Sequence, residues 1–249
     1  MQATGRKNEA EKLIVQHREI TEVRQGEMDK AIGKKDYSLA KHLIDDGIAI
    51  AQKKQHPGTV NQWKKQLLRV AVLENDIERV RLYSRYFAFD RRFDKEYYDQ
   101  WKKTYPASEW KAVIESYIDD TIKSITQKHE LNKNKPWYRP TPPLLHNIAP
   151  VYIEEQYWDR LLVLLQKEDN IDSVLQYHQH LVKRYPSELS SVYFPLLKAS
   201  GDKASSRSEY AQLVTKNEDD NKRYPWLKST YYFHCTKPQS KISTPPCHV

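Results

Sequence analysis

The sequence predicts an all-α protein whose helical hairpins stack into a repeat array, an α-solenoid, in two halves. Apolar residues recur three or four positions apart along most of the chain, the spacing of amphipathic helices, and no sustained strand-like alternation is visible. Helices with similar starts begin near residues 37, 77, 110 and 158. Such spacings are typical of hairpin repeats, which bury their apolar faces by stacking on neighbours. The alternative is a plain helical bundle whose helices share capping chemistry.

The N-terminal half, residues 1–131, contains six expected helices. In the fourth helix, the side chains of Ile77, Val80, Tyr83 and Phe87 are expected to face inward, because they recur at helical spacing. The six apolar stripes cover residues 10–32, 37–51, 60–71, 77–87, 93–101 and 110–125.

Polar residues mark the expected ends of these helices. Asp36, Asp76 and Ser108 stand where a side-chain oxygen can cap a helix N-terminus. Residues 56–58, His-Pro-Gly, are expected to end the second helix. The first stripe is either one long helix or a helix bent at Gly26.

A proline-rich segment, residues 132–147, separates the halves. Four prolines forbid a continuous helix there and favour an extended path. We expect a crossover between two domains, and the alternative is an ordered surface connection inside one continuous array. The prolines are Pro136, Pro140, Pro142 and Pro143.

The C-terminal half, residues 148–224, is also expected to be helical. Pro195 is expected to kink one of its helices, and a last helix is expected to begin at Ser205 or Ser206. Residues 225–249 are expected to form a disordered tail. The apolar stripes cover residues 148–152, 158–165, 171–185, 189–197 and 210–214.

Residues 35–51, KDYSLAKHLIDDGIAIA, resemble the second helix of a tetratricopeptide repeat (TPR). Tyr37, Ala40, Ile44 and Gly47 fall where that motif places aromatic, small and bulky residues. The Trp/Leu-Gly signature of the motif's first helix is missing. The resemblance implies a TPR-like form of the hairpin array.

A second resemblance covers about residues 10–220. The chain is similar to the helical region that follows the zinc finger in bacterial SWIM-type zinc-finger proteins. The finger requires a C-x-C…C-x-H ligand set, whereas residues 1–220 contain no cysteine, so the finger's zinc and nucleic-acid roles do not carry over. The segments that carry the resemblance are DYSLAKHLIDDGIAIAQKKQHPG (36–58), YIEEQYWDRLLVLLQ (152–166) and RYPSELSSVYFPLLKASGDKASSRSEYAQLV (184–214).

No catalytic, cofactor-binding or metal-binding residue is assigned from the sequence. His234-Cys235 and Cys247-His248 offer zinc-type ligands, but structural zinc sites usually space their ligands by two to four residues, and an inert tail is the alternative. His178 lies on an apolar stripe, which favours a core histidine with a hydrogen-bond partner. His180 is expected to be exposed. His42 and His129 lie among charges without a matched partner.

Adjacent carboxylates do not form acid–base pairs on helices, because neighbouring side chains diverge by about 100°. The chain has no G-x-S-x-G or H-E-x-x-H signature and no Gly-rich phosphate loop among its 6 glycines. We therefore expect a protein that is not an enzyme and has no cofactor. The adjacent carboxylates are Asp45-Asp46, Asp119-Asp120, Glu154-Glu155 and Asp219-Asp220.

The formal net charge of +8 raises the question of nucleic-acid binding. In residues 91–103, RRFDKEYYDQWKK, the aromatic side chains of Tyr97, Tyr98 and Trp101 offer stacking surfaces for bases, whereas the three acidic residues would repel phosphate. Solvated helix faces are the alternative. The basic pairs are Lys53-Lys54, Lys64-Lys65, Arg91-Arg92, Lys102-Lys103, Lys183-Arg184 and Lys222-Arg223.

The pattern favours a non-enzymatic scaffold that binds a protein or peptide partner in a groove. Its basic balance favours an acidic partner. A nucleic-acid-associated module working with a SWIM finger encoded elsewhere is the alternative function. No apolar run reaches the length of a membrane span and no signal peptide is visible at the start, so we expect a cytoplasmic protein without a membrane partner.

Overall fold

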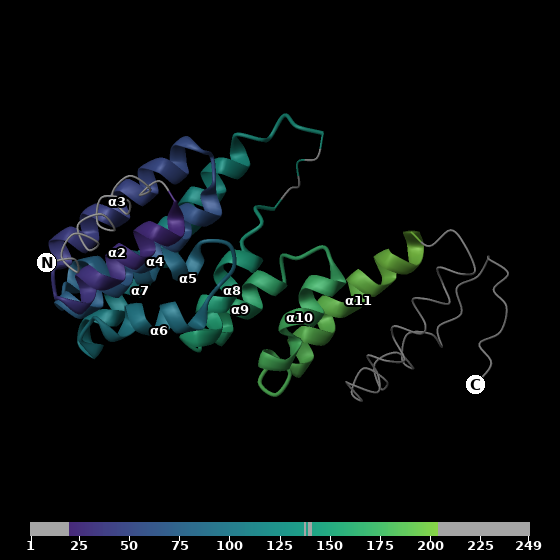
Figure 1. The fold of residues 1–249 in the computed structure, drawn as a ribbon. Coiled ribbons are helices and arrows are strands. Elements are labelled where there is room, and N and C mark those ends of the chain that lie inside the picture. The colour runs from purple at the N-terminus through teal and green to yellow at the C-terminus, as the bar shows by residue number, and fades with distance from the viewer. Residues whose placement is uncertain (1–19, 137, 139–140, 204–249) are drawn as a thin grey trace, which may run out of the picture. The chain divides into compact units, whose positions relative to one another are not determined.

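The computed structural model describes residues 20–136, 138 and 141–203, which form ten α-helices and no strand (Figure 1). The predicted all-α class is therefore confirmed for this part of the chain. The start of the first stripe, the expected last helix, the tail and both cysteines lie outside the described residues. The helices are α2 (Thr21–Gly33), α3 (Tyr37–Lys53), α4 (Pro57–Glu74), α5 (Ile77–Phe89), α6 (Lys95–Lys103), α7 (Ala107–Glu130), α8 (Leu145–Glu154), α9 (Trp158–Leu165), α10 (Ile171–Leu181) and α11 (Pro186–Lys203).

The chain forms two compact units that meet in sequence between Ser116 and Tyr117, within α7. In the first unit each helix packs on the next in order, from α2 to α6. In the second unit the same order runs from α8 to α11. Sequential neighbours therefore make the principal helix–helix contacts in both units. None of the described helices combines the length and the hydropathy needed to span a bilayer.

The core of the first unit lies between α2, α3 and α4. Tyr83 of α5 packs against it and against a second cluster formed by α4 and α5. Burial of these side chains from water stabilises the packing of consecutive helices. The core residues are Met28, Ala31, Ala40, Leu43, Ile44, Trp63, Leu67 and Val70.

Two of the three predicted N-caps are confirmed. The carboxylate of Asp36 accepts a hydrogen bond from the Leu39 amide at 3.0 Å, and that of Asp76 accepts one from Arg79 at 3.1 Å. The prediction for Ser108 is wrong, because α7 begins one residue earlier.

Two further expectations about local structure are corrected. The side chain of Ile77 is 47% exposed, so the prediction that it faces inward is wrong. It occupies the first position of α5, at the end of the stripe that buries Val80 and Phe87. Asp94 caps α6, because its carboxylate accepts hydrogen bonds from the backbone amides of Glu96 and Tyr97. The sequence did not predict this cap. Helix α2 continues through Gly26.

The α2–α3, α3–α4 and α4–α5 connections of the first unit share one geometry. Lys35, Gln55 and Asn75, each twenty residues after the last, adopt left-handed backbone conformations with φ of 56–59°. The amide that follows each of them donates to the carbonyl five residues earlier, always an alanine (Ala31, Ala51 or Ala71), at 2.9 Å. This is the Schellman motif, which satisfies the last carbonyls of a helix. Gln156 forms the same turn in the second unit.

Prolines lie inside two helices of the second unit. Pro150 lies within α8 and Pro195 within α11, which continues to Lys203. Pro186 begins α11, the position at which a missing amide proton costs no hydrogen bond. The core of this unit includes Leu161, Leu165, Val174, Leu181 and Leu189.

Candidate functional site

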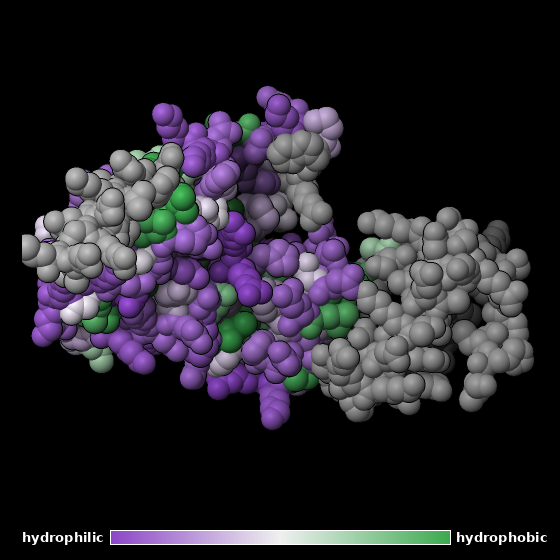
Figure 2. All heavy atoms as spheres, viewed as in Figure 1, coloured by the Kyte–Doolittle hydropathy of each residue, from purple (hydrophilic) through white to green (hydrophobic). Residues whose placement is uncertain are grey.

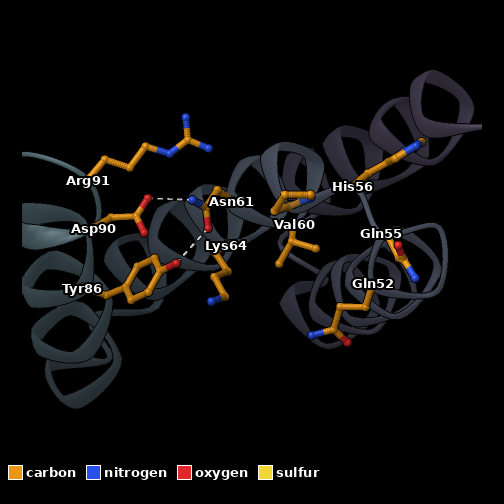
Figure 3. A pocket seen from close by; sticks show the side chains of 10 residues that line it. Gln52, Gln55, His56, Val60, Asn61, Lys64, Tyr86, Asp90 and Arg91 are labelled. Carbon is orange, nitrogen blue, oxygen red and sulfur yellow. Dashed lines mark hydrogen bonds between the residues drawn. The ribbon is translucent and has the colours of Figure 1, made fainter. Parts of the chain in front are cut away.

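A polar hollow of about 670 Å³ opens on the first unit where three helices meet (Figure 3). The end of α3 contributes Gln52, and the α3–α4 turn contributes Gln55, His56 and Pro57. The antiparallel order of the helices brings the C-terminal ends of α3 and α5 to the N-terminal part of α4. The hollow therefore depends on the sequential packing of these three helices.

Helical spacing selects the other side chains that line the hollow. On α4, Val60 and Lys64 lie one turn apart, with Asn61 beside them. On α5, Tyr86 and Asp90 are likewise separated by four residues. Residues four apart share a face of a helix, so each wall presents one stripe of side chains to the hollow.

Asn61 holds the only carboxylate among the residues that line the hollow. The Asn61 amide nitrogen donates to Asp90 Oδ2 at 2.7 Å, and the Tyr86 hydroxyl donates to Asn61 Oδ1 at 2.9 Å. Figure 3 shows both Tyr86 and Asp90 pointing toward Asn61. The three side chains form a chain of hydrogen bonds across the α4–α5 wall.

Two cations in the hollow have no acidic partner. No carboxylate of the described residues forms an ion pair with Lys64 or Arg91. The Lys64 ammonium lies 4.2 Å above the centre of the Tyr86 ring, a cation–π contact. The hollow therefore carries an excess of positive charge.

Three of the basic pairs noted in the sequence belong to this region. Lys64-Lys65 and Arg91-Arg92 each place one residue in the hollow, and Lys53-Lys54 stands between two glutamines that line it. The sequence shows these basic pairs but does not show that they lie close to one another in the fold. The signal that could have located them is the twenty-residue recurrence of the turns, which sets α3, α4 and α5 in antiparallel order.

A second hollow of about 350 Å³ lies between α3 and α5. Ser38, Lys41, His42 and Asp45 line it from α3, and Leu67 from α4. Arg79 and Tyr83 line it from α5. Burial raises the pKa of the Tyr83 hydroxyl, the nearby Asp45 carboxylate raises it further, and the Arg79 guanidinium partly opposes both.

The cations of the second hollow are paired. Lys41 Nζ lies 2.9 Å from Glu74 Oε1, and Arg79 Nε lies 3.4 Å from Asp76 Oδ2. His42 Nε2 lies 3.6 Å from Asp46 Oδ2, so His42 has a partner that the sequence reading did not identify. Asp45 and Asp46 do not act as a pair: one lines the hollow and the other faces His42.

The histidines singled out in the sequence lie in packed surroundings. His178 is fully buried, and its Nδ1 lies 2.7 Å from the Tyr193 hydroxyl, which confirms the prediction of a core histidine. Burial lowers the pKa of His178 to about 4. His180, expected to be exposed, is half-buried and stacks on Trp158 with an interplanar angle of 12°.

His129, Asp119 and Asp120 lie on α7, whereas Asp219-Asp220 lies outside the described residues. The His129 ring lies 4.4 Å from the Tyr138 ring, centre to centre. Asp119 and Asp120 are exposed on α7. Within the part of the chain that the structure describes, no three histidine, cysteine or acidic side chains gather in a way that would hold a metal ion.

Two of the three aromatic residues singled out in 91–103, Tyr98 and Trp101, are part of the core, and Tyr97 is partly buried. Tyr98 and Trp101 are 0% and 2% exposed, and the Trp101 ring lies 4.9 Å from that of Trp110. Tyr97 packs on Phe87 at 5.2 Å. Rings buried in this way cannot stack on nucleic-acid bases.

The visible face of the molecule is mostly hydrophilic. Figure 2 shows apolar residues there only in small, separate patches. Searches for a matching family model, curated protein or solved structure found none.

Proposed function

We propose that this protein is a non-enzymatic scaffold that binds an acidic segment of a partner protein in the hollow formed by α3, α4 and α5. The observation that carries the proposal is the pair of cations, Lys64 and Arg91, which have no carboxylate partner among the described residues. Acidic side chains of a bound segment would supply the missing counter-charges.

The remaining groups of the hollow fit a peptide ligand. The side-chain amides of Gln52 and Gln55 can donate to and accept from a peptide backbone, and neither takes part in a hydrogen bond within the described residues apart from those of the main chain. Asn61 holds the Asp90 carboxylate at one wall by a hydrogen bond of 2.7 Å, and among the described residues no ion pair joins that carboxylate to Lys64 or Arg91. The lining thus combines unpaired positive charge with amide groups.

The helices form, in this proposal, a TPR-like array of hairpins. Supporting observations are the sequential packing of the helices and the identical turns at Lys35, Gln55 and Asn75. The proposed kinship with SWIM-type proteins is tested by the DNA upstream of this chain. An adjacent segment that encodes C-x-C…C-x-H would support it.

Binding of nucleic acid is the second candidate function, because three basic pairs belong to the region of the hollow. Phosphate contacts release counterions, so such binding would weaken steeply as salt is raised. The burial of Tyr98 and Trp101 removes the stacking surface that favoured this function. A salt titration with labelled single-stranded oligonucleotides decides it: no binding at low salt excludes the function.

Fluorescence anisotropy with a pool of labelled, end-capped octapeptides rich in glutamate tests the scaffold function. We expect binding to the full chain, and a loss of about fivefold or more for Lys64→Glu and for Arg91→Glu, because each change reverses a charge in the hollow. Lys111→Glu makes the same change on the exposed surface of α7 and should leave affinity within about twofold. Equal affinity in all four proteins would overturn the proposal.

A further inference from the structure

We propose that the bound segment is extended and dipolar, with an acidic side chain at Lys64 and Arg91 and a basic side chain about three residues away, at Asp45. This inference rests on the proposed function and specifies the chemistry of the partner. It follows from the way the two hollows share their walls and from the distribution of unpaired charge between them.

The two hollows lie along one groove between α3 and α5, because the same helical stripes line both. On α5 the lining residues Arg79, Tyr83, Tyr86 and Asp90 follow at intervals of four, three and four residues. Such intervals keep side chains on one face of a helix. The α5 wall of the first hollow therefore continues into the second.

The floor and the opposite wall show the same continuity. Val60, Lys64 and Leu67 form one stripe of α4 beneath both hollows. On α3, Asp45 of the second hollow and Gln52 of the first are seven residues apart, close to two full turns. A ligand that enters one hollow can extend along the groove into the other.

The unpaired charge changes sign along the groove. In the first hollow, Lys64 and Arg91 have no acidic partner among the described residues. In the second, Lys41, His42 and Arg79 each have one, whereas Asp45 forms no ion pair with a described cation. Among the described residues, the groove is thus electropositive at one end and carries at the other a carboxylate that forms no ion pair with a cation.

The length of α3 sets the spacing of charges in the ligand. Seven helical residues from Asp45 to Gln52 span roughly 10 Å at 1.5 Å per residue. An extended chain advances about 3.3 Å per residue, so roughly three residues of a ligand separate its contacts at Asp45 and at Gln52, one in each hollow. Because the groove does not determine the N-to-C direction of the segment, both orders of the charges are included in the test.

Three pools of labelled octapeptides, otherwise randomised among uncharged residues, test the inference by anisotropy. The first carries glutamate and lysine three residues apart, in both orders. In the second, glutamine replaces the lysine, and in the third a second glutamate replaces it. We expect the first pool to bind about two- to fivefold more tightly than the second, and the third to bind most weakly, since exposed charge pairs contribute modestly.

Substitution of Asp45 assigns the effect to the groove. Asp45→Asn should remove the preference for the lysine pool, and Asp45→Lys should shift it to the double-glutamate pool. Glu96→Gln neutralises an exposed carboxylate outside both hollows and should leave the preference unchanged.

The outcomes separate this inference from the proposed function. Equal binding of all three pools, with sensitivity to Lys64→Glu, would overturn the dipolar ligand and leave the acidic-segment scaffold standing. Binding of no pool, or binding unaffected by Lys64→Glu, would overturn both.

Discussion

Gly47 of α3 lies directly against the indole ring of Trp63 of α4: a Cβ atom at Gly47 would come within 2.5 Å of Cε2 of Trp63. Both residues are buried, and Trp63 belongs to the central core cluster. The absence of a side chain at Gly47 therefore determines how closely α3 and α4 approach. The same two helices form the wall and the floor of the groove.

Gly47→Ala should destabilise the protein by about 1–3 kcal/mol, because an inserted methyl group overpacks the core. Alanine's better helix propensity, worth up to about 1 kcal/mol, offsets only part of this cost. Urea denaturation followed by circular dichroism measures the change in the free energy of unfolding.

The control for this substitution is Gly26→Ala. Gly26 is exposed within α2, and a Cβ added there meets nothing within 4 Å. Only the propensity gain remains, so we expect stabilisation by up to about 1 kcal/mol. If both variants were stabilised equally, the close contact between Gly47 and Trp63 would be contradicted.

Lys35→Gly should stabilise the α2–α3 turn by about 0.5–1 kcal/mol. The left-handed conformation of Lys35 strains a residue with a Cβ atom, and glycine adopts it freely, although glycine also gains entropy in the unfolded chain. Thermal denaturation of the purified variant measures the effect.

Lys34→Gly is the matched control, because the neighbouring Lys34 has a φ of −87°. There glycine offers no relief of strain and should destabilise slightly. Asn75→Gly should gain less than Lys35→Gly, since asparagine tolerates the left-handed region better. A loss of stability in Lys35→Gly would refute the assigned turn.

The second unit should lose about 2–3 kcal/mol of stability between pH 7.5 and 4.5 through His178. Its pKa is about 4 in the fold and 6.5 in the unfolded chain, so the unfolded state binds the proton first. This contribution is complete above pH 6.5 and is lost as pH falls toward 4. Denaturation curves across this range measure it.

His178→Gln removes the titrating group and should flatten this part of the pH dependence, even though the variant is less stable at pH 7.5. An unchanged slope in His178→Gln would contradict a buried, neutral His178.

Asn61→Ala should weaken binding of the glutamate-rich pool by about two- to fivefold. Without the Asn61 amide, the Asp90 carboxylate is free to take up the cations that otherwise contact the ligand. Competitive anisotropy measures the loss. Adding Asp90→Asn to Asn61→Ala should restore affinity, and a double variant as weak as the single one would exclude this explanation.

Helix identity and capping were largely predictable, because they depend on local residues. The side chains of Asp36 and Asp76 and the burial of His178 follow from sequence spacing alone. Ile77 was misplaced because helical periodicity puts it on the same stripe as Val80 but does not show whether the core covers the first residue of the helix. The shared turn was missed because glycine, its usual marker, is replaced by Lys35, Gln55 and Asn75.

The candidate site was not predictable from local patterns. Lys64 and Arg91 are 27 residues apart in the chain and belong to the same hollow only because α4 and α5 pack antiparallel. The expectation of an acidic partner came from the net charge, which does not show where in the fold the positive charges lie. Which cations remain unpaired depends on tertiary contacts such as Lys41 with Glu74.

A ¹H–¹⁵N NMR titration of the full chain with the glutamate–lysine octapeptide pool tests the central claim most directly. Signals from Gln52, Gln55, Asn61 and Lys64 should shift in proportion to occupancy, including the side-chain amides, while those of exposed α7 residues such as Lys111 stay in place. Shifts confined to residues outside the two hollows would contradict the account, and so would an unchanged spectrum at saturating peptide.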